Sequence, residues 1–409
     1  MKKAVLFALA SAVTVSLFSN FAHADEKAFY SRMDPKARLN LIGNAHVMKA
    51  LKPLDAQSTA PRDEDEKDNR NEKIDIVKYL SEKCDFNYTR DASGSPVRPH
   101  VSCVYKPRAD GDEFFGMSAK FDCSFTSQNS QGQVKERNLK VKYGPRQLEG
   151  GGYKEIPQAF LGTSLARLLG FYSSTYCPVD LTCKDCPGEN PWGMNKSKAP
   201  AMPGSVIEFK NVVIEVKQKG FKVQDTRAPS DEPQGFSFES ELNRYFPKTD
   251  KQTQLNLQAE RDALTLWFNF VVSNDADKHN TKLLCVRSIK PVDASQASKC
   301  ELSAAMVNDY GNSFGYKNGD TPLNVKEFSR SALSGNETAG ASGDARAQGH
   351  PMTEEGRTLF VNMAEAITDQ QLNDIFSLAQ IEKVSNAGPE AWKQAFRNKV
   401  LKIKQTKFR

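Results

Sequence analysis

Eight cysteines constrain this chain more than any other feature, because an even set of cysteines behind an export signal favours disulfides over free thiols. They are Cys84, Cys103, Cys123, Cys177, Cys183, Cys186, Cys285 and Cys300. A fold held together by several disulfides is therefore expected. The spacing of the cysteines alone leaves most of the pairings open.

One pairing can be predicted from its surroundings. Cys285 and Cys300 flank a polar, turn-rich segment between two strand-like runs. A bridge there would close a loop of about 15 residues, worth about 3 kcal/mol in the chain-entropy model. A rival interpretation is a metal site at Cys183-x-x-Cys186. We favour disulfides there too, because none of the five histidines lies near that pair in sequence.

The first residues have the pattern of a secretory signal. Lys2 and Lys3 precede an apolar run over 4–18, and Ala22-His23-Ala24 matches a small-x-small cleavage site. Residues 1–24 are therefore predicted to be a signal peptide cleaved after Ala24. No later stretch of about 18 residues is continuously apolar, so we expect no transmembrane segment in the mature chain. The expected location is periplasmic or secreted.

Composition excludes several classes of protein. The chain has 409 residues, 39% of them hydrophobic and 26% charged, which is typical of a globular protein and not of collagen, a coiled coil or a disordered chain. Its formal charge is +6, and loss of Lys2 and Lys3 with the signal leaves +4. So small an excess gives no reason to expect nucleic-acid binding. The length fits two domains or one large two-lobed domain.

The hydrophobic pattern divides the mature chain into three parts. Residues 25–72 form a polar leader with a charge run at 62–68, expected to be a solvated spacer. Residues 73–225 are predicted to form a β-rich N-lobe, with helices over 74–83 and 155–171, strands over 114–125 and 138–142 joined by a hairpin turn, and a strand pair over 206–223.

The remainder, 226–409, is predicted to form a mostly helical C-lobe. Its expected helices cover 255–273, 353–367, 369–379 and 389–403. Residues 329–349 show no periodicity and are predicted to be a loop. The fold class is therefore α+β, with a β-rich lobe, a helical lobe and a ligand site expected at their junction.

The most informative stretch runs from Trp267 to Val286. An apolar helix there leads into a polar cluster that contains Asp275 and Asn280, and Asp309 opens an Asp-Tyr-Gly run further on. Phosphoryl transfer needs one carboxylate to orient an attacking hydroxyl, and an amide oxygen and a second carboxylate to hold Mg²⁺. The EF-hand pattern fails here, because His279 stands where Asp or Asn is needed. Neither an H-E-x-x-H motif nor a Walker A loop occurs.

In these motifs and their order, the sequence resembles the protein-kinase-like fold, particularly atypical secreted and bacterial branches such as spore-coat protein kinases and persister-toxin kinases. Asp275 to Asn280 is similar to the kinase catalytic loop Asp-x4-Asn, and Asp309-Tyr310-Gly311 is similar to the Asp-Phe-Gly motif. His279 lies one residue from the position where lipid-kinase-like branches keep a histidine. The resemblance covers about residues 111–315.

The resemblance implies a two-lobed kinase-like fold that binds ATP with Mg²⁺ or Mn²⁺. Asp275 would be catalytic, and Asn280 and Asp309 would hold the metal. Lys142 matches the lysine of the third strand, with Lys140 on the same strand face as the second choice. The nucleotide-binding residues implied by the resemblance are Lys142, Glu155 and, in a phosphate-covering turn over 111–118, Gly116 and Ser118.

One departure concerns the helix that should offer a glutamate to the strand-three lysine. Glu155 stands at the very start of this helix, and the position one turn further in is Ala159. Either Glu155 or Glu149 pairs with Lys142, or the ion pair is missing. Its loss would favour a pseudokinase, because kinases need this pair in place.

The leading hypothesis is a secreted kinase-like phosphotransferase that moves the γ-phosphate of ATP to a hydroxyl of an unknown protein or small-molecule acceptor. Two alternatives stay open. ATP is expected to be scarce outside the cytoplasm, which favours a catalytically inactive kinase-like scaffold that acts as a periplasmic or secreted binding module. Nucleotidyl (AMP) transfer would use similar residues with the nucleotide reversed.

Overall fold

A computed structural model gives the structure of the chain. The residues that it describes are 31–33, 35–49, 74–107, 120–128, 134–143, 155–186, 203–218, 220–225, 235–237, 241–246, 249–273, 280–288, 300–307, 309–311, 313–314, 323–330 and 352–406. The predicted signal peptide and its cleavage site lie outside these residues and stay predictions.

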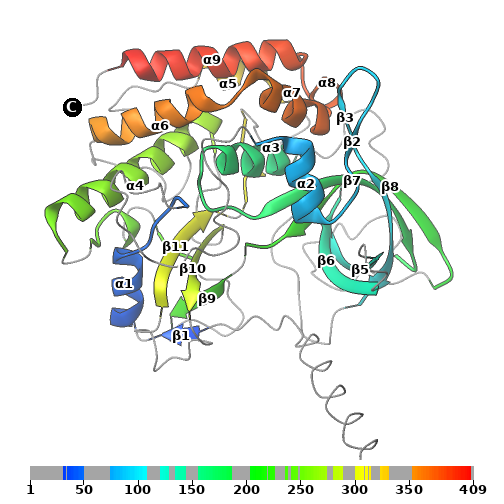
Figure 1. Cartoon of the computed structure of the whole chain (residues 1–409), viewed down its shortest axis with the longest axis horizontal. Coiled ribbons are helices and arrows are strands. Elements are labelled where there is room, and N and C mark those ends of the chain that lie inside the picture. The colour runs from blue at the N-terminus through cyan, green and yellow to red at the C-terminus, as the bar shows by residue number, and fades with distance from the viewer. Residues whose placement is uncertain are drawn as a thin grey trace, which may run out of the picture.

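A closed barrel forms the first half of the fold (Figure 1). Its strands, in spatial order, are β4 (His100–Lys106), β5 (Lys120–Gln128), β6 (Val134–Lys142), β8 (Val206–Val216) and β7 (Thr175–Lys184). Neighbours are antiparallel except β4 and β7, whose parallel pairing closes the barrel. Alternate residues of β5 are buried, namely Phe121, Cys123 and Phe125, as a strand facing a core requires. The predicted hairpin between β5 and β6 is confirmed.

A second sheet lies beside the barrel. It contains β1 (Ser31–Met33), β9 (Phe221–Asp225), β10 (Thr281–Ser288) and β11 (Cys300–Val307), in that order. β1 and β9 are parallel, and the other pairs are antiparallel. Helix α1 (Pro35–Gly43) packs against β9 and β11. A separate two-stranded ladder joins β2 (Thr89–Arg90) to β3 (Pro96–Val97).

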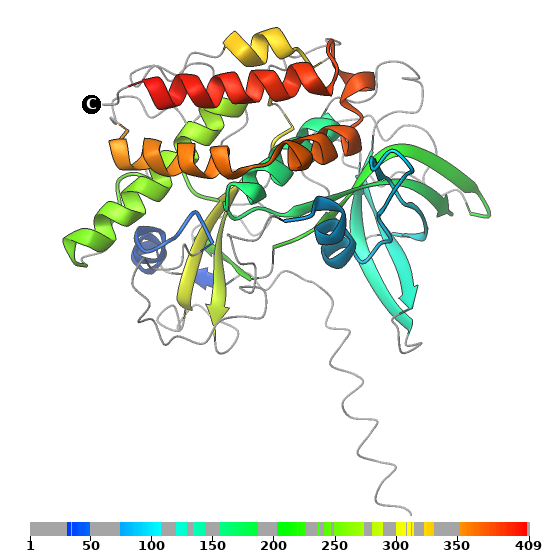
Figure 2. The same cartoon turned by 45° about the horizontal axis from the view of Figure 1, so that its top comes forward.

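Helices cover the barrel and the second sheet, and the predicted helices are confirmed with small shifts at their ends. They are α2 (Ile76–Cys84), α3 (Glu155–Leu168), α4 (Lys251–Val271), α5 (Val325–Arg330), α6 (Glu354–Ala366), α7 (Asp369–Leu378), α8 (Ile381–Val384) and α9 (Pro389–Gln405). In Figures 1 and 2, α6 lies between α4 and α9. Side chains of Asp75, Asp250, Thr353 and Thr368 cap the first turns of four helices. The α+β class is therefore confirmed.

All eight cysteines are paired. The bridges are Cys84–Cys177, Cys103–Cys123, Cys183–Cys186 and Cys285–Cys300. The predicted bridge between Cys285 and Cys300 is confirmed: it joins β10 to β11. Cys183 and Cys186 also form the disulfide that we favoured over a metal site.

The expectation that residues 25–72 act only as a spacer is wrong for 31–49. This segment supplies β1 and α1, and its apolar residues Ile42, Ala45 and Met48 are fully buried. After α1, His46 forms a parallel bridge with Ala304 of β11. The physical reason is that the apolar residues from Leu39 to Met48 provide enough surface to dock on the second sheet, despite the polar sequence around them.

The expected strand pair over 206–223 is also wrong. β8 and β9 both form, but β8 pairs with β6 and β7, whereas β9 pairs with β1 and β10. The local sequence pattern is that of two strands joined by a short turn. In the structure, however, β8 and β9 pair with different neighbours and belong to different sheets. The predicted boundary between lobes at 225/226 stays a prediction.

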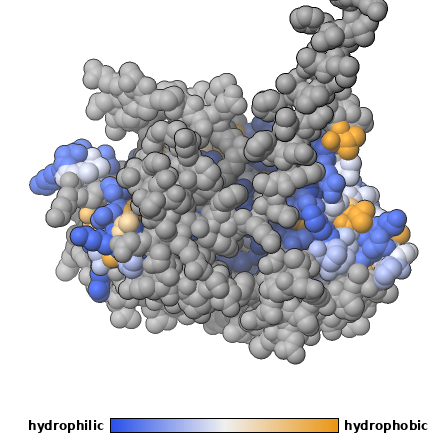
Figure 3. All heavy atoms as spheres, turned by 90° about the horizontal axis from the view of Figure 1, so that it is seen from below, coloured by the Kyte–Doolittle hydropathy of each residue, from blue (hydrophilic) through white to orange (hydrophobic). Residues whose placement is uncertain are grey.

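The described surface on the face seen in Figure 3 is mostly hydrophilic, with small separate apolar spots. Exposed large apolar side chains of the described residues, such as Val134 and Val206, are of the kind normal on protein surfaces. Within the described ranges, no helix is both long enough and apolar enough to cross a bilayer.

Candidate functional site

The β10–β11 hairpin brings two predicted site residues to one end of the second sheet. Its register pairs Thr281 with Val307. Asn280 immediately precedes Thr281, and Asp309 follows two residues after Val307, so both residues leave the hairpin at the same end. They are 29 positions apart in sequence. Antiparallel pairing of β10 and β11 nevertheless brings them to the same end of the hairpin.

Lys142, the last residue of β6, meets Asp309 at this place. Its Nζ donates a hydrogen bond to Asp309 Oδ2 at 2.8 Å across a separation of 167 residues. The backbone N–H of Gly311 donates to the other carboxylate oxygen at 3.0 Å. The Lys142 side chain is 2% exposed and that of Asp309 is 19% exposed, so the pair is largely shielded from solvent. Lys142 Nζ also lies 5.1 Å from the centre of the Tyr176 ring.

The pair shifts the pKa values of both groups. Burial alone would lower the pKa of Lys142, but the charges of Asp309 and, less strongly, Glu155 and Glu215 raise it well above 10.5. Burial alone would raise the pKa of Asp309, but the charge and hydrogen bond of Lys142 lower it below 3.8. Lys142 is therefore a cation and Asp309 an anion at neutral pH.

Glu155, at the first position of α3, lies at the same site. A Cβ atom placed on Gly311 would stand 2.3 Å from Glu155 Cγ and 2.9 Å from its Oε1, so this carboxylate packs directly on the Asp-Tyr-Gly turn. Its charge also helps to raise the pKa of Lys142. Ala159 is buried one turn further along α3. Of the options left open by the sequence, Glu155 is thus close enough to interact with Lys142, and Glu149 lies outside the described residues.

Tyr310 anchors the Asp-Tyr-Gly turn in the core. Its ring is fully buried, stacks on Phe268 with ring centres 5.9 Å apart, and makes an edge contact with Trp267 at 6.2 Å. Both partners lie on the last turns of α4, just before the segment that carries Asp275. On the other side, Gly162 of α3 leaves room for Tyr310: a Cβ there would stand 2.3 Å from Tyr310 Cβ. Tyr310 therefore packs between α3 and α4 and fixes the position of the turn.

Substituting Gly162→Ala is expected to lower the free energy of unfolding by about 1–3 kcal/mol, because the added methyl group cannot fit against Tyr310 without moving the turn or α3. Chemical denaturation would measure the shift. Gly388→Ala is the control for steric clash, since nothing lies within 4 Å of a Cβ there; because Gly388 is the N-cap of α9, its cost should stay below about 1 kcal/mol. Equal stability of the Gly162 and Gly388 variants would contradict the close packing.

A second ion cluster adjoins the first and was missed by sequence reasoning. Glu215 of β8 is fully buried and forms ion pairs with Lys140 and, at 4.0 Å, with Lys282. Burial raises the pKa of Glu215, but Lys140, Lys282 and Lys142 together lower it far below 4.5. Lys140, the second choice for the nucleotide lysine, therefore binds Glu215, whereas Lys142 binds Asp309.

Lys120 is another cation near the site that the sequence did not indicate. It lies directly opposite Lys142 in the β5–β6 pairing. Burial, with the charges of Lys142 and Lys140, lowers the pKa of Lys120 to about 8, although Asp309 and Glu155 oppose this effect. The sequence could have indicated Lys120, because pairing the two strands outward from the predicted hairpin turn places Lys120 opposite Lys142.

Ser313 lies in the run Gly311-Asn312-Ser313-Phe314-Gly315, which matches the spacing of the G-x-S-x-G nucleophile motif. That motif requires a serine exposed at a sharp strand-to-helix turn. Ser313 is fully buried, and the left-handed backbone conformation belongs to Phe314, with φ 60°. The structure therefore gives no support to a serine hydrolase here.

The other predicted site residues, Asp275, His279, Gly116 and Ser118, lie outside the described residues, and their roles stay predictions. Those that are described offer hard oxygen donors: the Asp309 carboxylate and the Asn280 amide at one hairpin end. Such donors fit Mg²⁺ or Mn²⁺ and do not favour a soft metal.

No protein-family model matches the chain, and no curated protein matches it in sequence. Among solved structures, the chain is similar to CtkA, a proinflammatory kinase of Helicobacter pylori, with a TM-score of 0.37 and 10% sequence identity. The match covers 75% of this chain and 95% of that one. A similarity at this TM-score is too low to support a conclusion about the fold or the function of this chain.

Proposed function

We propose that this protein has a kinase-like fold and transfers the γ-phosphate of ATP to a hydroxyl group. The ion pair between Lys142 and Asp309 carries the proposal. Two residues singled out separately, one on a strand and one in an Asp-Tyr-Gly run, lie 167 positions apart and meet at 2.8 Å. Asn280 leaves the β10–β11 hairpin at the same end.

The order of elements supports the same proposal. Lys142 ends the third barrel strand in chain order, α3 follows with Glu155 at its start, and Asp309 follows a hairpin that begins beside Asn280. In protein kinases a lysine on the third strand, a glutamate on the next helix and the Asp of Asp-Phe-Gly form the nucleotide site. The three residues in this chain that correspond by order lie together.

Each residue has a role that its chemistry permits. Lys142 would contact the phosphates of the nucleotide, and Asp275 would orient the acceptor hydroxyl and receive its proton. Asn280 and Asp309 would hold Mg²⁺ or Mn²⁺, which when bound would offset the negative charge of the phosphates. Glu155 would keep the Lys142 ammonium group in position. Burial of the Lys142–Asp309 pair strengthens these electrostatic contacts relative to water.

The test is incubation of the mature protein, disulfides intact, with Mg²⁺ or Mn²⁺ and ATP labelled on either the γ- or the α-phosphate. We expect label from the γ-phosphate alone, in the protein itself or in an added hydroxyl acceptor. Asp275→Ala is expected to reduce transfer by about 10²–10⁴-fold, the usual contribution of a general base. The control is Glu382→Gln, an exposed acid of α8, which should leave transfer unchanged.

The other outcomes separate the alternatives. Label from the α-phosphate would replace phosphoryl transfer by nucleotidyl transfer. Absence of any label, together with no thermal stabilisation by nucleotide, would contradict the enzyme and favour an inactive scaffold. A nucleotide at about 100 times its dissociation constant should stabilise the folded state by about 2.7 kcal/mol, so nucleotide binding would be clearly visible.

A further inference from the structure

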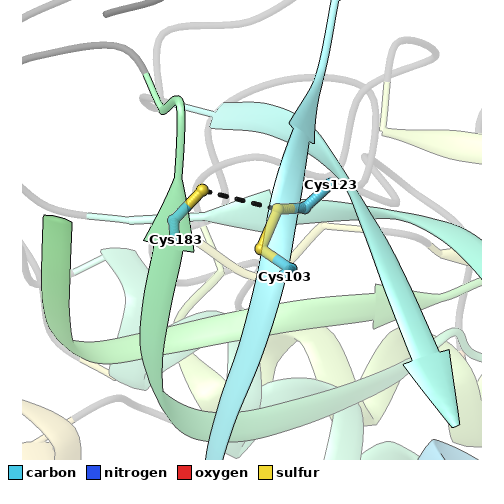
Figure 4. A group of neighbouring side chains, drawn as sticks. All are labelled: Cys103, Cys123 and Cys183. Carbon is cyan, nitrogen blue, oxygen red and sulfur yellow. Dashed lines mark hydrogen bonds between the residues drawn. A yellow bond between two sulfur atoms is a disulfide. The ribbon is translucent and has the colours of Figure 1, made fainter. Parts of the chain in front are cut away.

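Two of the disulfides lie against each other inside the barrel. Figure 4 shows Cys103 bonded to Cys123, with Cys183 facing them from the neighbouring strand. The Sγ atoms of Cys123 and Cys183 are 3.5 Å apart, and Cys183 is itself bonded to Cys186. Four sulfur atoms from four cysteines therefore form one cluster, which we call the barrel sulfur cluster.

Strand pairing explains why these cysteines meet. β4 lies between β5 and β7, and Cys103 on β4 pairs in register with Cys183 on β7. Cys123 comes from β5 on the other side of β4. Cys186 follows β7 after a turn in which Asp185 adopts the left-handed conformation, with φ 59°. Adjacent strands and this turn fix the four positions, whether or not the sulfur atoms are bonded to each other.

Three of the four sulfur atoms already lie close enough together to suit a tetrahedral thiolate metal site, and Cys186 is bonded to the third of them. Zinc binds thiolate sulfur at about 2.3 Å, which places the sulfur atoms of a tetrahedron about 3.8 Å apart. The sulfur atoms of Cys103, Cys123 and Cys183 all lie within 4.8 Å of one another. Cys183-x-x-Cys186 has the ligand spacing common in structural zinc sites.

The cluster differs from the other two bridges in the chain. Cys84–Cys177 and Cys285–Cys300 are separate from it and from each other. Among the described residues, the barrel sulfur cluster alone brings three potential metal ligands within 4.8 Å. Its four cysteines are at most 6% exposed, so a bound ion would be shielded from competing ligands.

We propose that Cys103, Cys123, Cys183 and Cys186 form a tetrathiolate zinc site when the protein is reduced. Two molecules of a dithiol reductant would reduce the two disulfides to four thiols, each giving its two hydrogens to the cysteines and leaving as a cyclic disulfide. Binding of one Zn²⁺ then releases the four thiol protons. The site has two forms: two adjacent disulfides under oxidising conditions, and a metal centre under reducing ones. This proposal is independent of the phosphotransferase function.

The first test reduces the full chain with dithiothreitol, removes the reductant under nitrogen and adds Co²⁺ as a spectroscopic probe. We expect one Co²⁺ per chain, with the absorption of a tetrahedral thiolate complex that Zn²⁺ displaces. The double variant Cys183→Ser/Cys186→Ser should lose this absorption. The matched variant Cys285→Ser/Cys300→Ser, which also lacks one disulfide, should keep it. Loss in both variants, or in neither, would overturn the proposal.

A second measurement uses the unmodified chain as its own control. The reduced protein is treated with iodoacetamide with and without Zn²⁺, and alkylation of each cysteine is followed by mass spectrometry. Zinc should slow alkylation of the four cluster cysteines by about tenfold or more, because a coordinated thiolate is not free to react. Cys84, Cys177, Cys285 and Cys300 should react at unchanged rates. Equal protection of all eight cysteines, or of none, would overturn the proposal even if reduction loosened the fold.

Discussion

Asp309→Ala is expected to lower the free energy of unfolding by about 3–5 kcal/mol, besides abolishing metal-dependent nucleotide binding. The substitution removes the carboxylate that accepts a hydrogen bond from Lys142, whose side chain is 2% exposed in the intact protein. The other acids near Lys142, Glu155 and Glu215, would offset only part of the desolvation cost of this buried charge. Lys142→Met should cost less, because Asp309 is 19% exposed and water can reach its carboxylate.

The double variant Lys142→Met/Asp309→Ala makes this prediction quantitative. It should be more stable than the sum of the single effects implies, by about 1–3 kcal/mol, because no buried charge remains unpaired. Denaturant midpoints of the four proteins, with disulfides intact, give the coupling. Lys210→Met is the control: this lysine is 62% exposed, contacts its acids at 3.8 and 3.9 Å, and should matter by less than about 0.5 kcal/mol. Additive single effects would contradict a coupled pair.

The pair should also make stability depend on pH in a defined direction. Because the pKa of Asp309 in the folded state lies below its usual 3.8, the pair contributes its full stabilisation above pH 3.8. That contribution is lost as the pH falls through the lowered pKa. The difference in stability between wild type and Asp309→Ala should therefore shrink in acid and stay constant between pH 5 and 8.

Arg261→Met is expected to destabilise the fold by a similar amount, about 3–5 kcal/mol. Arg261 of α4 is fully buried, and its Nη2 donates to the backbone oxygens of Ile42 and Gly43 at 3.0 and 2.9 Å. Its Nη1 donates to the carbonyl oxygen of Tyr245 at 2.8 Å. Methionine would fill part of the volume but leave these carbonyl groups without their donor.

The loss should be concentrated where α1 ends, so the variant should expose residues 31–49 to proteolysis before the rest of the chain. Limited proteolysis with peptide mapping would detect this, alongside denaturation. Arg244→Met is the matched control, because Arg244 is exposed in the neighbouring segment. If Arg261→Met and Arg244→Met behave alike, the carbonyl contacts contribute little to docking of α1.

Local patterns in the sequence were sufficient for most helices and for the β5–β6 hairpin. Helix α4 follows from its apolar spacing, and α3 ends before Gly170, whose φ of 83° suits glycine. The Cys285–Cys300 bridge was predictable because its ends flank a single hairpin. These features depend on residues close in sequence, so no knowledge of distant contacts is needed.

Two errors have the same physical origin. The segment 31–49 resembles a polar leader and 206–223 resembles a hairpin, because the local sequence carries no information about the distant partners of either segment. In the structure, the first segment contacts Arg261 and β11. In the second segment, β9 pairs with strands of the second sheet and not with β8. Burial against partners more than fifty residues away outweighed the local pattern.

For the candidate site, the sequence by itself determined which groups are available: a cation at Lys142, carboxylates at Glu155 and Asp309, and an amide at Asn280. Only the tertiary structure decided which of them meet. Two lysines on one face of β6 are indistinguishable in sequence. In the structure, the β6–β8 pairing places Lys140 on Glu215, and the end of the β10–β11 hairpin brings Asp309 to Lys142. The Coulomb energy of such pairs depends on separation and burial, which a linear sequence does not specify.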